Sequence, residues 1–432
     1  MKRSLTFLSI SALLFLLLGR AVAAQIPADT CALTLDVPDG ASIVVDGRDY
    51  GMRRELTFEK LAPAKTYTSR ILIRFPDGRE AQRMAFLQGG RRVSVAARVP
   101  SRIVYTWESD NGSLGIWSII PGETRATKIV LGDENNNWVE PSISPDGGKL
   151  AAVRAIFGEE KSRRELWVMD IDGANAQRVV ENFGTDVPKW SPDSRSLLFS
   201  RTPGANIAEI VSVDFQGRQR LLNSNGYSAD YSPDGTQIVF TRTVGTSGGR
   251  FRHDLYVMNA DSSGERRILE NRTFGEWSPT GDRILYVKPW DEVFTANPDG
   301  TGDVRLFSDL SPMGGQPRWS PDGVHLAAMR GAKASRLYVM RSNGQESHSL
   351  SLAETMGRLL PGSAPSNGER KIQEDFCWSP DGAQLALIWE SIEAFLDGDQ
   401  FGRLVVCSPD GTGVRILLPV PSDGRIEELD WR

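Results

Sequence analysis

Ser144-Pro145-Asp146-Gly147 is the first of six copies of one short phrase that recurs along this chain of 432 residues. The other copies begin at Ser191, Ser232, Ser278, Ser320 and Ser379. Successive copies start 41 to 59 residues apart. A repeat of this length indicates an array of similar supersecondary units, each too small to bury a core alone.

The tetrapeptide has the composition of a tight turn. Proline sets φ for the second position of a type I turn, and glycine accepts the left-handed conformation that closes a hairpin. Two copies depart from the pattern, with Ser194 in place of glycine and Thr280 in place of aspartate. Because serine has a Cβ atom, we expect strain or a different turn type at Ser194.

Strand-like segments surround each turn. An aromatic residue precedes five of the copies, at Trp190, Tyr231, Trp277, Trp319 and Trp378. A β-branched and apolar run follows the turn, then a phrase such as Glu165-Leu-Trp-Val-Met-Asp170, then a short closing segment. Runs of four to six such residues bounded by Gly, Pro, Asn and Asp predict strands, and four strands per unit make one blade of a β-propeller.

The number of strands predicts the number of blades. Candidate second strands occur seven times, at Ile103, Leu150, Leu197, Ile238, Ile284, Leu326 and Leu385. The chain's last residues, 428–432, read like the segment before a Ser-Pro-Asp-Gly turn, so we expect them to supply the innermost strand of the first blade. The predicted fold is all-β, with seven blades closed by the C-terminal strand; six blades is the alternative.

The phrases Trp-Ser-Pro-Asp-Gly and Leu-Tyr-Val-Met-Asn resemble those of the TolB-type, WD-repeat-like propeller over about residues 101–432. The resemblance implies the fold. It does not fix a function, because the same propeller accompanies transport-associated proteins, peptidases and sensor kinases.

Residues 31–98 do not carry the repeat and predict a small antiparallel, sandwich-like β domain. Expected strands are 32–37, 42–45, 66–74 and 92–96. The segment from Val37 to Gly51, with Pro-Asp-Gly-Ala at 38–41, resembles the PEGA domain and a related small domain of planctomycete exported proteins. That resemblance implies an interaction module without catalytic residues.

The N-terminus has the pattern of an export signal over residues 1–24. Lys2 and Arg3 precede an apolar run from Leu5 to Leu18, and small residues at 21–24 fit a cleavage site. The apolar run is too short for a stable membrane span. Three cysteines, Cys31, Cys377 and Cys407, do not form a disulfide framework or a metal-binding pattern, and we expect them to pack as small core residues.

Charge is divided unevenly along the chain. Residues 31–100 hold 12 Lys and Arg against 8 Asp and Glu, whereas residues 101–432 hold 35 against 46. An acidic propeller argues against nucleic acid as a partner.

No catalytic constellation emerges from the sequence. Gly245-Thr-Ser-Gly-Gly249 matches G-x-S-x-G, but it lies between two expected hairpin strands rather than between a strand and a helix. The three histidines, His253, His325 and His348, are not spaced as metal ligands or as part of a catalytic triad. A metal-dependent hydrolase or lactonase would use polar residues near the innermost strands, for which the candidates are Asn137, Asp186, Asp230, Glu276, Glu374 and Asp375. We expect no metal and no cofactor.

Binding residues are expected where the copies differ. The loops that enter the innermost strands combine aromatic, amide and charged residues, which suit peptide or ligand contact. The candidates are Asn137, Trp138, Asp186, Tyr227, Phe274, Arg318, Asp375 and Phe376. Two insertions, 352–374 and 390–403, also interrupt the repeat and are candidate binding loops.

These observations favour a non-enzymatic, exported protein of a bacterial envelope, in the periplasm or at the cell surface, that binds a peptide or a partner protein at one propeller face. Two alternatives stay open. One is the metal-dependent hydrolase, and the other is a surface protein that binds cell-surface glycan through residues 31–98.

Overall fold

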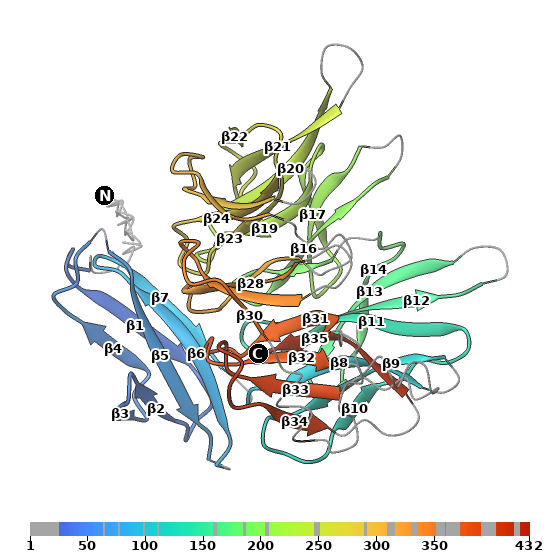
Figure 1. Ribbon diagram of the computed structural model, residues 1–432, viewed down its shortest axis with the longest axis horizontal. Coiled ribbons are helices and arrows are strands. Elements are labelled where there is room, and N and C mark those ends of the chain that lie inside the picture. Colours follow the sequence, from blue (N-terminus) through green and yellow to red (C-terminus); the bar gives the residue numbers. More distant parts are fainter. Residues whose placement is uncertain are drawn as a thin grey trace, which may run out of the picture.

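Nine β-sheets make up the described part of the chain in the computed structural model (Figure 1). The structure describes residues 26–432 except 64, 77, 98–99, 110–111, 159–161, 185–186, 204–206, 246–250, 289–291, 309–315, 331–335, 351–358, 360–371, 390–402 and 419–423. The predicted export signal, almost all of both insertions and most of the G-x-S-x-G segment lie outside these residues. Within the described ranges, no helix has the length and apolar character to span a membrane.

Seven of the sheets follow one another after residue 101, and each has four antiparallel strands. The second sheet contains β11 (Asn136–Ile143), β12 (Lys149–Ile156), β13 (Arg163–Asp170) and β14 (Gln177–Val180). The third contains β15 (Lys189–Trp190), β16 (Ser196–Arg201), β17 (Glu209–Asp214) and β18 (Gln219–Asn223). The fourth contains β19 (Tyr227–Tyr231), β20 (Gln237–Gly245), β21 (Phe251–Asn259) and β22 (Arg266–Leu269). The fifth sheet contains β23 (Thr273–Trp277), β24 (Ile284–Lys288), β25 (Glu292–Ala296) and β26 (Val304–Phe307). The sixth contains β27 (Arg318–Trp319), β28 (His325–Arg330), β29 (Arg336–Arg341) and β30 (His348–Ser349). The seventh contains β31 (Ile372–Trp378), β32 (Leu385–Trp389), β33 (Arg403–Cys407) and β34 (Arg415–Leu418).

The first sheet joins the two ends of this region. Its strands are β8 (Ile103–Ser109), β9 (Leu114–Ile119), β10 (Thr127–Val130) and β35 (Gly424–Trp431), in the order β10-β9-β8-β35. In the antiparallel pairing of β35 with β8, Trp431 lies opposite Ile103 and Leu429 opposite Tyr105. The C-terminal strand therefore occupies the place that the first strand of each unit takes in the other six sheets.

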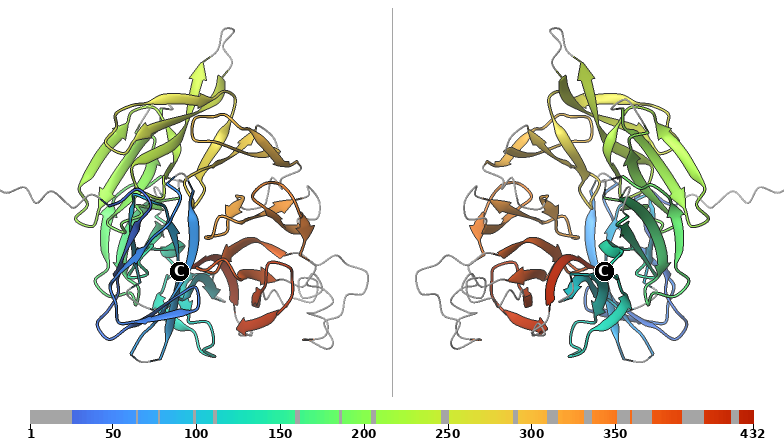
Figure 2. Two further views of the ribbon diagram at one scale, coloured as in Figure 1. Left: turned by 90° about the vertical axis from the view of Figure 1, so that its left-hand side faces the viewer. Right: turned by 90° about the vertical axis from the view of Figure 1, so that its right-hand side faces the viewer.

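Apolar side chains hold neighbouring sheets together face to face. Phe199 of the third sheet packs in one cluster with Leu166 of the second, and Phe376 of the seventh packs with Leu337 of the sixth. A further cluster joins Ile388 of the seventh sheet to Ile103 of the first. Figure 2 shows the sheets following one another in chain order around a common centre, with the last beside the first. Burial between consecutive sheets is the main source of stability in such an arrangement.

The repeated turns explain the repeated serine and aspartate. In the copy at Ser320, the buried hydroxyl donates to Asp322 Oδ1 (2.5 Å) and accepts the N–H of His325 (2.8 Å), while Asp322 Oδ1 accepts the N–H of Val324 (3.0 Å). The glycine N–H closes the turn on the serine carbonyl at 2.8 Å. Ser194 makes the same closing bond at φ 60°, so the turn type is retained and the expected strain is a left-handed serine.

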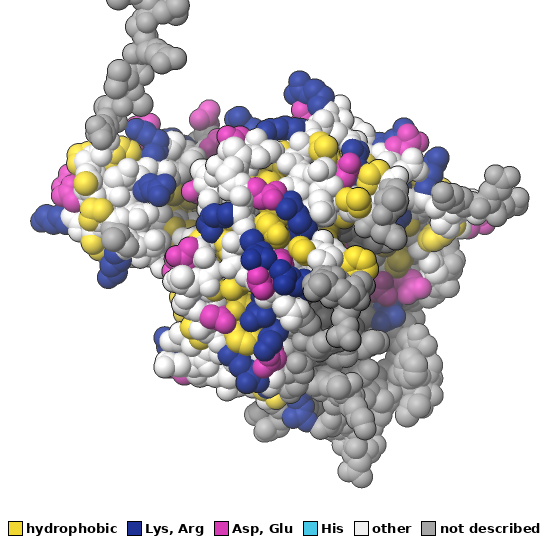
Figure 3. Space-filling model, turned by 90° about the horizontal axis from the view of Figure 1, so that it is seen from above, with side chains coloured by type: hydrophobic (Ala, Val, Ile, Leu, Met, Phe, Trp, Pro, Cys, Tyr) yellow, Lys and Arg dark blue, Asp and Glu magenta, His cyan; other side chains and the backbone are white. Residues whose placement is uncertain are grey.

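The outermost strands carry paired charges. Arg178 on β14 contacts the buried Glu165 at 2.8 Å, and Arg267 on β22 contacts the buried Asp254 at 3.4 Å. Figure 3, which views the molecule from above β22, shows Lys and Arg interspersed with Asp and Glu on that side. Charged side chains on an exposed strand oppose pairing with another chain's edge.

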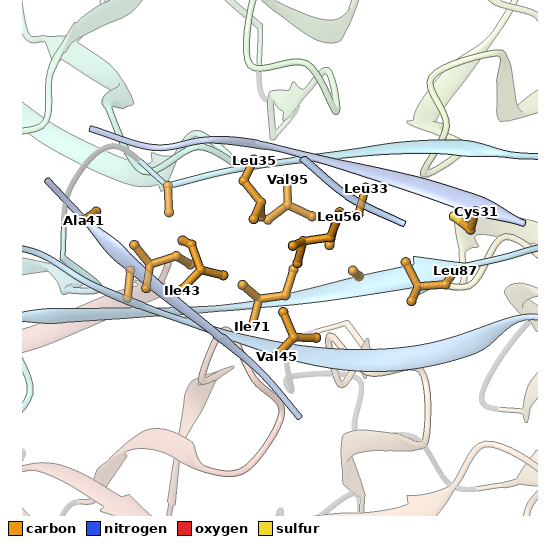
Figure 4. Close-up of a cluster of buried hydrophobic side chains, with 14 of the residues drawn as sticks. Cys31, Leu33, Leu35, Ala41, Ile43, Val45, Leu56, Ile71, Leu87 and Val95 are labelled. Atoms are coloured by element: carbon orange, nitrogen blue, oxygen red, sulfur yellow. The ribbon is translucent and has the colours of Figure 1, made fainter. Parts of the chain in front are cut away.

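Residues before 98 form two sheets that share one core. Their strands are β1 (Cys31–Asp36), β2 (Ser42–Val45), β3 (Arg48–Gly51), β4 (Glu55–Phe58), β5 (Tyr67–Arg74), β6 (Glu80–Leu87) and β7 (Arg92–Ala96), in the orders β4-β1-β7 and β3-β2-β5-β6. Leu33, Ile43 and Ile71 are fully or almost fully buried in the cluster between the sheets (Figure 4).

One expectation for these N-terminal sheets was wrong. The sequence predicted a wholly antiparallel unit, but β1 pairs in parallel with β7. The alternating pattern of a half-buried strand is the same for either direction, so the sequence pattern carried no signal for it. The three cysteines are buried and free, as expected.

Candidate functional site

The sheets after residue 101 present two different faces. We call the side with the Ser-Pro-Asp-Gly turns the turn face. The opposite side, which carries the connections from second to third strands and from each fourth strand to the next first strand, is the loop face. The binding candidates that the structure describes all lie on first strands, Tyr227 and Phe274 at the loop-face end and Arg318, Asp375 and Phe376 nearer the turn.

A bulge bends the first strand in several sheets just before its repeated segment. The pairing register shifts in β11, β19, β23 and β35, and one residue near each shift has a left-handed backbone: Glu140 (φ 55°), Ser228 (φ 51°), Phe274 (φ 57°) and Glu428 (φ 44°). Bulges reorient side chains at strand ends. Here the bulge places the residues at and just after it towards the neighbouring first strands.

Carboxylates on the first strands bind backbone N–H groups of the next sheet. Glu428 Oε2 accepts from Glu140 (2.5 Å) and Asp430 Oδ2 accepts from Ile143 (2.6 Å), which links the first sheet to the second. Asp375 Oδ2 accepts from Leu429 at 2.5 Å, which links the seventh sheet to the first.

Three further hydrogen bonds also join neighbouring sheets. Asp230 Oδ2 accepts from Trp277 at 3.0 Å and links the fourth sheet to the fifth. Arg318 of the sixth sheet donates to Asp375 Oδ1 (2.8 Å) and to the carbonyl of Phe376 (2.5 Å) in the seventh. These acids act as links between sheets.

Burial dominates the electrostatics of two acids on first strands, Glu276 and Glu428. Desolvation raises the pKa of Glu276 to about 7, with Lys189 opposing this rise and Asp230 adding to it. Desolvation likewise raises the pKa of Glu428 to about 7, although the N–H of Glu140 and the hydroxyl of Thr106 favour its ionised form. Both carboxyl groups are therefore harder to ionise than exposed glutamates.

Within the described residues, the predicted metal ligands are not assembled into a metal-binding group. Asp230 and Asp375 are engaged by backbone N–H groups, and Asn137 Oδ1 accepts the N–H of Leu114 (2.9 Å). Asp186 and the side chain of Glu374 lie outside the described residues. Among the residues that the structure describes, no three His, Cys, Asp or Glu side chains are grouped so that they could hold a metal ion.

The eight binding candidates have different environments. Trp138 (6 % exposed) and Phe376 (0 %) are buried in cores between sheets, which corrects their assignment as contact residues, because a buried ring offers no surface to a partner. Tyr227 is half-buried, with its hydroxyl 2.8 Å from His253 Nδ1, and Phe274 is half-buried beside its bulge. Arg318 and Asp375 pair with each other.

The sequence reasoning missed a second group of residues on the loop face. Large apolar side chains are exposed there at Leu131, Phe157, Val187, Ile207 and Phe251. Phe251 is 75 % exposed at the start of β21, and Phe157 and Ile207 occupy the corresponding connections of the second and third sheets. The available signal was an apolar residue in a loop where polar residues are the rule.

The N-terminal sheets lie against the turn face. Ser101 donates its N–H to the carbonyl of Glu80 on β6 at 3.2 Å. Against the effect of burial, hydrogen bonds from Ser232 and Thr236 hold the pKa of the turn residue Asp234 below its usual value, and the charge of Arg91 adds to this. Figure 2 shows these sheets in front of the seven four-stranded sheets after residue 101 in one view and behind them in the opposite view. The loop face is therefore on the side away from the N-terminal sheets.

Comparisons with known proteins agree with this architecture. No family model matches the chain. It is 25 % identical over 303 residues to dipeptidyl-peptidase 5 of Porphyromonas gingivalis, covering 68 % of this chain and 42 % of that protein. It is 32 % identical over 140 residues to the Tol-Pal system protein TolB of Anaeromyxobacter dehalogenans, covering 31 % and 29 %. The chain thus spans less than half the length of these relatives.

A solved structure gives the fold. The β-propeller domain of the trilobed protease from Pyrococcus furiosus matches with a TM-score of 0.53 at 15 % identity, over 73 % of this chain and 94 % of that domain. The chain is all-β and propeller-like, and its similarity to TolB proteins supports a propeller of the TolB type.

Proposed function

We propose that the protein is an exported binding protein of the bacterial envelope whose loop face binds a peptide segment or a partner protein. In this proposal the seven sheets are the blades of one propeller closed by β35, and residues 31–98 are a separate, PEGA-like domain on the turn face. The export pattern of residues 1–24 and the similarity to TolB proteins support an envelope location, in the periplasm or at the cell surface.

One observation carries the choice of face. Five of the large apolar side chains that are exposed in the described residues lie on the loop face, on connections of the first three sheets and at the start of β21. Exposed apolar groups on a rigid scaffold are typical of protein-binding surfaces, where aromatic residues supply much of the binding energy. The half-buried Tyr227 and Phe274 lie on the same side of their sheets and extend this surface.

The test is affinity capture from envelope extract with matched variants. A triple variant, Phe157→Ser, Ile207→Ser and Phe251→Ser, removes apolar surface from the loop face alone. The control variant, Met52→Ser with Leu221→Ser, removes exposed apolar groups away from the loop face. Met52 lies in the turn between β3 and β4, and Leu221 lies on β18. We expect a partner that the wild type and the control capture and the triple variant loses. Capture by the triple variant, or loss in the control, would contradict the proposal.

The similarity to dipeptidyl-peptidase 5 favours a second candidate, a propeller that serves peptide hydrolysis. Because the match covers 42 % of that protein, its activity does not pass to this chain without a direct test. Hydrolysis of dipeptide p-nitroanilides by the purified protein, abolished by Ser247→Ala, would favour the enzyme. Absence of turnover alongside partner capture favours the binding protein.

A further inference from the structure

The hairpin of the fourth sheet projects beyond the neighbouring fifth sheet on the loop face (Figure 1). Measured from the equivalent pairs next to their turns, β20 and β21 stay paired three residue pairs further out than β24 and β25 do. The last three pairs are Thr243 with His253, Val244 with Arg252 and Gly245 with Phe251. The described strands of the fifth sheet therefore do not cover this end of the hairpin.

One face of the projecting hairpin is turned towards the fifth sheet. Side chains alternate along a strand, so Phe251 and His253 share the face of Leu255. Leu255 is buried in a cluster with Tyr286 of the fifth sheet. Tyr227 of β19 reaches the same face, where its hydroxyl lies beside His253. The face thus runs from a buried core at Leu255 to the ring of Phe251, which is 75 % exposed.

The polar contacts on this face leave one nitrogen of His253 available. Nδ1 is 2.8 Å from the hydroxyl of Tyr227 and 3.2 Å from the hydroxyl of Thr243. Because a phenol is the better donor of the pair and an imidazole nitrogen the better acceptor, Nδ1 accepts and the neutral ring carries its proton on Nε2. Nε2 makes no hydrogen bond to a residue that the structure describes. The rings of Tyr227 and His253 meet edge to face at 6.0 Å, which holds the imidazole in place.

The charged side chains of the hairpin lie on its other face, where they pair. Arg252 contacts Asp254 at 3.0 Å, and Arg242 contacts Glu265 at 2.6 Å. Arg272, which follows β22, donates to two carbonyls of its own segment. The face towards the fifth sheet therefore offers aromatic rings, hydroxyl groups and an N–H donor, but no carboxylate or amide side chain of β20 or β21.

We propose, building on the peptide-binding function proposed for the loop face, that a proline-rich segment of the partner docks on Phe251, His253 and Tyr227. A polyproline II segment is preformed, and its prolines bring carbonyl acceptors without N–H groups. Its rings pack on aromatic side chains and its carbonyls accept from donors such as His253 Nε2. An ordinary extended segment would bring an N–H group at every residue, for which this face has no carboxylate or amide oxygen.

The experiment titrates an acetylated and amidated proline decamer into the purified protein by calorimetry, with a glycine-serine decamer as the control peptide. We expect saturable binding of the proline decamer alone. Phe251→Ser should weaken it about tenfold or more, because an aromatic anchor is lost. His253→Phe keeps a ring but removes the N–H donor, and should weaken it about fivefold. Leu221→Ser, which removes an exposed apolar group from β18, is the matched control and should leave the affinity unchanged.

A wild type without saturable binding of the proline decamer would overturn the proposal, as would equal affinity for the glycine-serine peptide. Because Phe251 is exposed, Phe251→Ser should keep the fold, and an unchanged affinity in this variant also counts against the site. Capture of a partner from envelope extract without binding of the proline decamer would leave the loop-face function standing and remove the proline-rich ligand. Binding of the decamer without a captured partner would do the reverse.

Discussion

The turn face and the loop face are the two ends of the same strands, yet they are built on different principles. On the turn face one hydrogen-bonded motif recurs: a serine hydroxyl donates to an aspartate at 2.5–2.7 Å in five of the six turns. On the loop face the described connections differ from one another, and some of them carry exposed large apolar side chains such as Phe157, Ile207 and Phe251. The difference shows that repetition encodes the scaffold, while departures from it are where a binding function can arise.

The sharpest test of this comparison is Phe376→Ala set against Phe251→Ala. The sequence placed Phe376 among the contact residues, but its ring is fully buried between the sixth and seventh sheets. Its removal should lower the free energy of unfolding by about 3–5 kcal/mol, whereas removal of the exposed Phe251 ring should change it by less than about 0.5 kcal/mol. Urea unfolding of both variants measures the difference; similar losses would show that the loop face is part of the core.

A second test breaks one repeated turn. In Ser320→Ala the hydroxyl that joins Asp322 to the N–H of His325 is lost inside a buried turn, so we expect a loss of about 2 kcal/mol. The comparison is Ser263→Ala, which removes an exposed hydroxyl that donates to Asp261. Thermal unfolding should show a larger fall in melting temperature for Ser320→Ala than for Ser263→Ala. An equal fall would mean that the hydrogen bonds of the buried turn contribute no more to stability than an exposed one.

A third test uses pH. The pKa of Glu428 is raised from 4.5 to about 7 in the folded chain, so the folded state binds more protons than the unfolded state between these values. The free energy of unfolding should therefore fall as pH rises from about 5 to 7, by about 1–2 kcal/mol for this group. Glu428→Gln should flatten that slope and Glu276→Gln should flatten it further. Denaturant unfolding at pH 5, 6, 7 and 8 checks this; an unchanged slope in Glu428→Gln would contradict it.

The smallest expected effect concerns the turn glycines. Gly235 has φ +70°, and an added Cβ would meet only Pro192 at ordinary contact distance. Gly235→Ala should therefore cost about 1 kcal/mol from backbone strain alone. Ser194→Gly should leave the free energy of unfolding nearly unchanged. It relieves the strain of a left-handed serine but loses the 3.0 Å hydrogen bond from the Asp146 N–H to Ser194 Oγ. Stabilisation by Gly235→Ala would contradict the role of the repeated glycine.

The repeat was readable because hairpin chemistry is local. Seven second strands were expected, and the structure has a four-stranded sheet at each of these positions. The contacts of the candidate site were harder to predict from the sequence. Asp230 and Asp375 were rightly expected on first strands, but their partners, the N–H groups of Trp277 and Leu429, lie 47 and 54 residues away in sequence. No local pattern shows that such carboxylates are already occupied.

The sequence by itself determined the strand and turn pattern of this protein, because alternation, turn residues and repeat length depend on neighbouring positions. Only the tertiary structure decided which aromatic rings are buried, which carboxylates link sheets, and which face stays away from the N-terminal sheets. These properties depend on contacts between residues far apart in the chain, and burial fixes both the energy and the charge state of each group only once those contacts exist.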